Sequence, residues 1–218
     1  MLGVYDYTVV LTYMSLISAG LGIFMSLSGI SNPYVGCAFL VLCGVLDSFD
    51  GKVARTKKNR SEMEKNFGIQ IDSLSDLVAF GVLPACIGKA FLQQSLDAGG
   101  RFIFESSNVA SKIFTIIAYA ILLVYVLAAL IRLAYFNVTE EERMKKEGGV
   151  RKYYEGLPVT SAAAIFPLLL IITHFANVEV ILPFLIVMFL TAFAFVSKFR
   201  VPKPSLEALR ERRAHRRG

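Results

Sequence analysis

Four aspartates follow a spacing that suits metal-assisted phosphoryl transfer. Asp47 and Asp50 are three residues apart, and Asp72 and Asp76 are four residues apart. On an α-helix, residues three or four positions apart lie on one face. If each pair lies on its own helix and the two helices are antiparallel neighbours, the four carboxylates meet at one level along the helices. Ionised carboxylates placed side by side repel one another, so the group needs a compensating charge, which divalent cations supply.

Oxygen ligands of this kind favour Mg²⁺ or Mn²⁺. Two such ions about 3.5–4 Å apart can hold both the attacking and the leaving oxygen of a displacement at phosphorus. The pattern therefore predicts two divalent cations on the four aspartates. A single exposed acidic pair at the end of a helix would carry much less information.

Small residues and one arginine are interleaved with these aspartates. Gly51, Ala54 and Gly68 leave space in which a nucleotide diphosphate could approach the backbone, and Arg55 could pair with phosphate oxygens. The aspartates could instead be solvated charges at helix ends. Four of them at helical spacing, on otherwise apolar segments, favour a built site.

Long uncharged runs dominate the segments that must position this site. The chain has 218 residues, of which 55% are hydrophobic and only 18% are charged. No charged residue occurs between Asp6 and Asp47, and residues 113–131, 157–178 and 180–197 are also free of Asp, Glu, Lys and Arg. A membrane helix needs about 20 apolar residues. The sequence predicts an all-α, polytopic integral membrane protein.

Six membrane helices are predicted. The aspartates lie at the end of the second helix and at the start of the third, on either side of the loop that joins them. The expected ranges are residues 8–29, 34–53, 67–90, 110–135, 159–175 and 180–198. A single six-helix domain, residues 1–201, would then be followed by a basic tail, residues 202–218. The tail could lie on anionic headgroups or serve only as a solvated topology anchor.

The distribution of basic residues predicts the orientation of the protein. Lys and Arg are concentrated in residues 55–65, residues 137–156 and the tail, whereas the alternate loops nearly lack them. Positive segments stay on the cytoplasmic side. Six spans then place both termini in the cytoplasm and the aspartates near the cytoplasmic face of the cell membrane. The net charge of +6 is explained by this topology, so no nucleic-acid partner is expected.

The aspartate region resembles the CDP-alcohol phosphotransferase family, whose members carry D-x-x-D-G-x-x-A-R followed by G-x-x-x-D-x-x-x-D. The eight fixed positions are matched here by Asp47, Asp50, Gly51, Ala54, Arg55, Gly68, Asp72 and Asp76. Twelve residues separate Arg55 from Gly68, which is more than is usual in the family. Residues 56–67 are therefore expected to form a lengthened cytoplasmic loop.

The resemblance implies a six-helix fold and a role for each matched residue. Asp47, Asp50 and Asp72 would bind metal, and Asp76 would help to bind the second ion and act as general base on the alcohol. The remaining four, Gly51, Ala54, Arg55 and Gly68, would line the CDP portion of the substrate. Family members often form dimers, so a homodimer is expected.

Three segments further resemble the phosphatidylserine synthase branch of that family. They are residues 72–84, residues 132–137 and residues 155–162. The glycerol-phosphate branch usually has proline after the third aspartate and lysine after the fourth, where this chain has Ser73 and Leu77. The resemblance implies transfer of a phosphatidyl group from CDP-diacylglycerol to the hydroxyl of L-serine, which releases CMP and forms phosphatidylserine. Inositol phosphate or glycerol phosphate as acceptor, or a cation transporter, are the alternatives.

Serine is a zwitterion, so its pocket needs a partner for the carboxylate. Arg132 and Asn137, at the expected cytoplasmic end of the fourth helix, are proposed for this pocket. Arg132 could instead be a topology residue whose side chain extends to the membrane surface. Ser73 and Ser75 could bond the acceptor, although serines in membrane helices often bond the backbone or a neighbouring helix.

Overall fold

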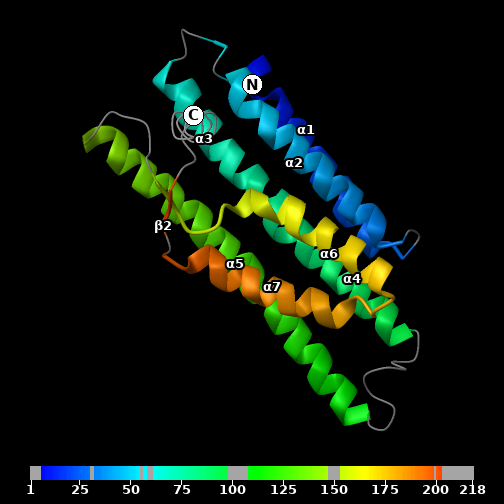
Figure 1. Cartoon of the computed structure of the whole chain (residues 1–218). Helices are drawn as coiled ribbons and strands as arrows, with labels where there is room; N and C mark the ends of the chain where they lie inside the picture. The colour runs from blue at the N-terminus through cyan, green and yellow to red at the C-terminus, as the bar shows by residue number, and fades with distance from the viewer. Residues whose placement is uncertain are drawn as a thin grey trace, which may run out of the picture.

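Long helices lying side by side make up the protein, shown as a computed structural model in Figure 1. The structure describes residues 6–29, 32–54, 56–57, 61–97, 108–146, 153–198 and 200–202. In chain order the elements are η1 (Tyr7–Val9), α1 (Val10–Leu27), α2 (Tyr34–Ala54), α3 (Glu62–Asp76), η2 (Leu77–Val82), α4 (Leu83–Asp97), α5 (Asn108–Lys146), β1 (Tyr153–Glu155), η3 (Val159–Ser161), α6 (Ala162–Ala176), α7 (Ile181–Val196) and β2 (Arg200–Pro202).

Helices occur at all six predicted positions, and two of them are longer than predicted. The third begins at Glu62, and the fourth, α5, continues beyond residue 135 to Lys146. The early start has a local cause, because Ser61 and Glu64 form a reciprocal capping box. The prediction of a lengthened loop is therefore wrong for residues 62–67, which are helical.

Five helical segments are long and apolar enough to cross a bilayer, judged by length and composition. They are Tyr7–Leu27, Tyr34–Ala54, Glu62–Asp97, Val109–Arg143 and Val159–Ala176. Together they indicate an integral membrane protein. Helix α7 has 16 residues and is shorter than these segments. The sixth span, the orientation of the termini and the boundary of the domain at residue 201 stay predictions. Residues 203–218 of the predicted tail lie outside the described residues.

The third span is continuous from α3 through η2 to α4, with π-helical geometry in the middle. Pro84 has no N–H to donate to the carbonyl of Phe80, four residues earlier. The hydroxyl of Tyr125, on α5, donates to that carbonyl at 2.6 Å. Tyr125 is fully buried and packs against the rings of Phe166 and Phe195. A side chain from the neighbouring span thus satisfies a backbone acceptor in the core.

Glycines allow α2 to approach two neighbouring helices closely. A Cβ at Gly22 of α1 would lie 2.8 Å from the Cβ of Phe39 on α2, and one at Gly44 of α2 would lie 2.6 Å from the Cβ of Ala163 on α6. Small residues commonly make such contacts in membranes, where helices associate by packing rather than by the hydrophobic effect. The close contacts hold α2, which carries Asp47 and Asp50, firmly in the bundle.

A short two-stranded sheet joins two segments that are distant in the chain. Strands β1 and β2 pair antiparallel, with Tyr154 opposite Val201. Gly156 follows β1 with a φ of +70°, and a Cβ there would lie 2.9 Å from the carbonyl oxygen of Ser197. This small sheet was not predicted, and the fold is otherwise helical in the described part of the chain.

Replacing Tyr125 with phenylalanine should destabilise the protein without creating a cavity. The hydroxyl that donates to the buried carbonyl of Phe80 would be lost, and a buried acceptor left unsatisfied costs about 1–3 kcal/mol. We expect a lower unfolding temperature in detergent, measured by intrinsic fluorescence or light scattering. Tyr119→Phe is the matched control, because Tyr119 lies on the same helix and is exposed. Equal unfolding temperatures for both variants would contradict this account of the core.

Candidate active site

Three of the four predicted metal ligands converge between α2 and α3. Asp47 and Asp50 lie on the last two turns of α2, and Asp72 lies on α3. Each offers one carboxylate oxygen, and these three atoms lie within 4.8 Å of one another. Figure 1 shows that α2 ends and α3 begins at the same end of the bundle, which explains the meeting. All three aspartates are half-buried, so the cluster is enclosed yet open to a small ligand.

Asp76 lies one helical turn beyond Asp72, at the last residue of α3 before η2. It is also half-buried, but it does not belong to the group of three carboxylates that share the 4.8 Å limit. Its place on the same face of α3 follows from the spacing of four residues. Its roles as a ligand of a second ion and as general base stay predictions.

A cavity of about 280 Å³ adjoins the carboxylate cluster. It is lined by Thr8, Val9, Thr12, Asp50, Gly51, Ala54, Lys65, Gly68, Ile69 and Asp72. The lining thus includes three of the four residues predicted to contact CDP, and two of the aspartates. The fourth, Arg55, lies outside the described residues.

Gly51 contributes free space to this cavity. A Cβ built on Gly51 would meet nothing within 4 Å, in contrast to the glycines that pack helices together. The absence of a side chain there is not needed for helix packing. It leaves room beside Asp50 for a group that enters the cavity.

Three polar lining residues were missed by the sequence analysis: Thr8, Thr12 and Lys65. The hydroxyl of Thr12 donates to a carboxylate oxygen of Asp50 at 3.4 Å. Lys65 precedes Gly68 by one helical turn and forms an ion pair with Glu62 at 2.7 Å. Two signals could have found them. Thr8 and Thr12 are spaced by one turn in an uncharged run, and Lys65 shares the stripe of Gly68 and Asp72.

The predicted acceptor residues do not form one cluster. Asn137 of α5 donates from its amide to the hydroxyl of Ser73 at 2.7 Å, so this pair joins α5 to α3 next to Asp72. Ser75 is buried and donates to the backbone carbonyl of Thr12 at 3.2 Å, which connects α3 to α1. Ser75 thus makes a hydrogen bond to a neighbouring helix, which the sequence analysis gave as the alternative to acceptor binding by Ser75.

Arg132 lies inside the bundle rather than at its surface. Its side chain is buried, and its Nε donates to the carbonyl of Leu157 at 3.1 Å. The guanidinium also lies 5.8 Å from the centre of the Phe136 ring. A buried side chain of this kind does not extend outward as a topology residue does. It is also absent from the described lining of the cavity, and its role in an acceptor pocket stays a prediction.

Comparison with known proteins decides the family. The family described as CDP-alcohol phosphatidyltransferase matches residues 8–196, which is most of the chain. The chain belongs to the CDP-alcohol phosphatidyltransferase family. The match covers both the carboxylate cluster and the cavity, and in this CDP-alcohol phosphatidyltransferase family member six of the eight motif residues lie in one or both of them.

Three relatives of this family member carry names that include serine. It is 38% identical over 130 residues to a CDP-diacylglycerol–serine O-phosphatidyltransferase of Saccharomyces cerevisiae, which covers 58% of this chain and 38% of the yeast protein. It is 28% identical over 171 residues to the Helicobacter pylori protein of that name, covering 77% and 60%. It is 31% identical over 153 residues to an archaetidylserine synthase of Methanothermobacter thermautotrophicus, covering 70% and 52%. The chain therefore spans between 38% and 60% of the length of these relatives.

Replacing Asp72 with asparagine should weaken the binding of a divalent cation. The change removes one of three convergent carboxylates, so Mn²⁺ affinity should fall about tenfold or more, since even residues that only orient a ligand cost that much. A titration followed by the electron paramagnetic resonance of free Mn²⁺ measures it. Asp97→Asn is the control, because Asp97 lies at the end of α4 and accepts a bond from Gln93. An equal loss in both variants would contradict a metal site at Asp72.

Proposed function

We propose that this protein transfers a phosphatidyl group from CDP-diacylglycerol to the hydroxyl of L-serine. The products are phosphatidylserine and CMP. The observation that carries the proposal is the carboxylate cluster of Asp47, Asp50 and Asp72 beside a cavity lined by Gly51, Ala54 and Gly68. Acidic ligands can hold a cation that pairs with a diphosphate, and open backbone beside them leaves room for the nucleotide.

The donor set fits a divalent cation. Carboxylate oxygens within 4.8 Å of one another, on two helices, are the hard ligands that suit Mg²⁺ or Mn²⁺. Asp47, Asp50 and Asp72 would hold a first ion, and Asp76 would help to hold a second. When bound, these ions would offset the charge of the diphosphate and of the departing CMP.

The residues around the cluster then have separate tasks. Gly51, Ala54 and Gly68 give the cytidine diphosphate access to the backbone, and Arg55 is proposed to contact its phosphates. Asp76 accepts the proton of the alcohol as its oxygen attacks the phosphorus that carries the lipid. The bond from that phosphorus to the oxygen of CMP breaks, and CMP takes the electron pair. General-base help is needed because a neutral hydroxyl is a poor nucleophile.

The acceptor is proposed to bind on the side of α5. Asn137 donates a hydrogen bond to Ser73, the residue that follows Asp72, so this pair of acceptor candidates lies beside a metal ligand. Arg132 would pair with the serine carboxylate from deeper in the bundle, and Ser75 would support α3 through Thr12. The serine in the names of the relatives supports this choice of alcohol.

Three further parts of the proposal concern the protein in its membrane. The active site faces the cytoplasm, where serine and the basic loops are expected. All six apolar helices, including the short α7, span the bilayer, and both termini are cytoplasmic. The protein works as a homodimer.

The reaction is tested by measuring CMP release from CDP-diacylglycerol by the purified protein with Mg²⁺ or Mn²⁺. L-serine, inositol phosphate and glycerol phosphate are each supplied separately. We expect release that depends on L-serine and that falls by about 10²-fold or more in Asp76→Asn, the usual size of a general-base contribution. Release with another alcohol would discard serine as the acceptor. No release with any alcohol, from protein that binds Mn²⁺, would contradict the proposed reaction.

The position of the nucleotide is tested by Gly51→Val. The new side chain would enter open space, so the fold should be kept while the cavity is reduced. We expect an unchanged unfolding temperature but an increase of the KM for CDP-diacylglycerol of about tenfold, because the side chain occupies space meant for the substrate. Gly20→Val on α1 is the control, since a Cβ at Gly20 also meets nothing within 4 Å and the cavity lies elsewhere. An unchanged KM in Gly51→Val would place the nucleotide outside this cavity.

A further inference from the structure

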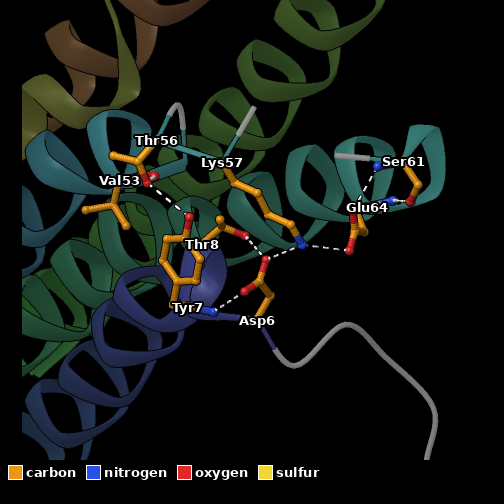
Figure 2. Close-up of polar contacts among 8 residues, drawn as sticks. All are labelled: Asp6, Tyr7, Thr8, Val53, Thr56, Lys57, Ser61 and Glu64. Atoms are coloured by element: carbon orange, nitrogen blue, oxygen red, sulfur yellow. Dashed lines mark hydrogen bonds and ion pairs between the residues drawn. The ribbon is translucent and has the colours of Figure 1, made fainter. Parts of the chain in front are cut away.

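A polar network joins three segments of the chain next to the cavity (Figure 2). Its centre is Lys57, which lies between α2 and α3. The Nζ of Lys57 contacts a carboxylate oxygen of Asp6 at 2.8 Å and one of Glu64 at 3.0 Å. Asp6 precedes η1 and α1, whereas Glu64 lies in the first turn of α3. We call the group of Asp6, Lys57 and Glu64 the clasp.

Further hydrogen bonds tie the clasp to the ends of the helices. Asp6 accepts from the backbone N–H of Tyr7 at 2.7 Å and so caps η1. Glu64 accepts from the backbone N–H of Ser61 at 2.8 Å as part of the cap of α3. The hydroxyls of Tyr7 and Thr56 lie 3.2 Å apart, which adds a second connection between the segment before α1 and the end of α2. Asp6 and Glu64 therefore fix the backbone at the starts of η1 and α3 in addition to forming ion pairs with Lys57.

The charges of the clasp persist across the neutral pH range. The hydrogen bond from Lys57 holds the pKa of Asp6 below its ordinary value, and the hydrogen bond to Asp6 raises the pKa of Lys57. The pair is lost only when the pH falls through the lowered pKa of Asp6 or rises through the raised pKa of Lys57. The side chains of Lys57 and Asp6 are partly shielded, with 28% and 20% of their surface exposed.

Each segment held by the clasp also supplies a wall of the cavity. Thr8 follows Tyr7 by one residue, Ala54 precedes Thr56 by two residues, and Lys65 follows Glu64 by one residue. All three line the cavity with Gly51 and Gly68. Three walls of the cavity therefore lie beside contacts that meet at Lys57.

We propose that the clasp positions the walls of the nucleotide cavity and thereby sets the affinity for the cytidine diphosphate part of the substrate. Lys57, Asp6 and Glu64 are positioning residues, since they act through Thr8, Ala54 and Lys65. The inference rests on the proposed function, and it assigns a task to the segment between Arg55 and Gly68. That segment carries both Lys57 and the cap of α3.

The test compares Lys57→Met with Lys57→Arg and with Arg143→Met. Lys57→Arg keeps the charge and the donors. Arg143→Met is the matched control, because it removes a cation whose ion pair with Glu140 stays within α5. All variants are first checked for a single species by size-exclusion chromatography in detergent. Two quantities are then measured, the hydrogen exchange of residues 61–69 and the affinity for CDP in the presence of Mg²⁺.

We expect faster exchange in residues 61–69 and a CDP affinity about threefold to tenfold weaker in Lys57→Met, because loosened walls must be ordered when the ligand binds. The KM for CDP-diacylglycerol should rise by a similar factor, while kcat at saturation stays within about twofold. Lys57→Arg should restore both properties, and Arg143→Met should match the wild type. The double variant Asp6→Asn with Lys57→Met should bind CDP no more weakly than Lys57→Met alone, since both changes break the same contact.

Three results would overturn the inference. Unchanged exchange in Lys57→Met would mean that the clasp does not hold α3. Faster exchange with unchanged CDP affinity would mean that the clasp holds α3 without serving the cavity. A wild-type protein that binds no CDP would overturn the inference and the proposed function together. If the wild type binds CDP and Lys57→Met weakens binding, but no alcohol accepts the phosphatidyl group, the clasp is supported and the proposed reaction alone fails.

Discussion

The mutual repulsion of carboxylates at the edge of a membrane is the constraint on which the rest of this structure depends. Asp47, Asp50 and Asp72 bring oxygen atoms within 4.8 Å of one another on two helices that belong to candidate membrane spans. Such a group tends to push α2 and α3 apart unless it is neutralised by cations or by protons. The fold must therefore hold these two helices together by contacts other than those among the carboxylates.

Those contacts come from α1 as much as from α2 and α3. Helix α1 packs closely on α2 where Gly22 meets Phe39, and Ser75 of α3 donates to the backbone carbonyl of Thr12 on α1. Thr12 in turn donates to Asp50. A single residue of α1 thus touches both helices that carry the cluster. Helix α1 contains no part of the family motif, but it contacts both helices that carry the motif and supplies part of the cavity lining.

Different kinds of polar contact stabilise the buried core of the helix bundle and the region near the cavity. In the core, the hydroxyl of the buried Tyr125 donates to the carbonyl of Phe80, and polar backbone groups within a bilayer must find such partners inside the protein. Near the cavity, the polar contacts are partly exposed ion pairs and helix caps. An exposed ion pair contributes less to the free energy of unfolding than a buried hydrogen bond does. A well-packed core with a partly exposed rim suits the proposed reaction, in which a lipid-linked nucleotide and a small alcohol enter the site and CMP leaves it.

The sequence by itself determined the features that depend on local periodicity. Hydropathy located the helices, and the spacing of Asp47, Asp50, Asp72 and Asp76 placed them on two helical faces, because helix geometry repeats every 3.6 residues. The helical start at Glu62 was also readable from Ser61 and Glu64, a capping-box pattern, but the expectation of a long loop obscured it. Only the tertiary structure decided which distant residues meet, because this depends on how the helices rotate and pack against one another. Four features are of this kind: the contribution of Thr8 and Thr12 to the cavity, the pairing of Asn137 with Ser73, the burial of Arg132, and the bridge from Lys57 to Asp6 and Glu64. Local spacing carries no record of those rotations.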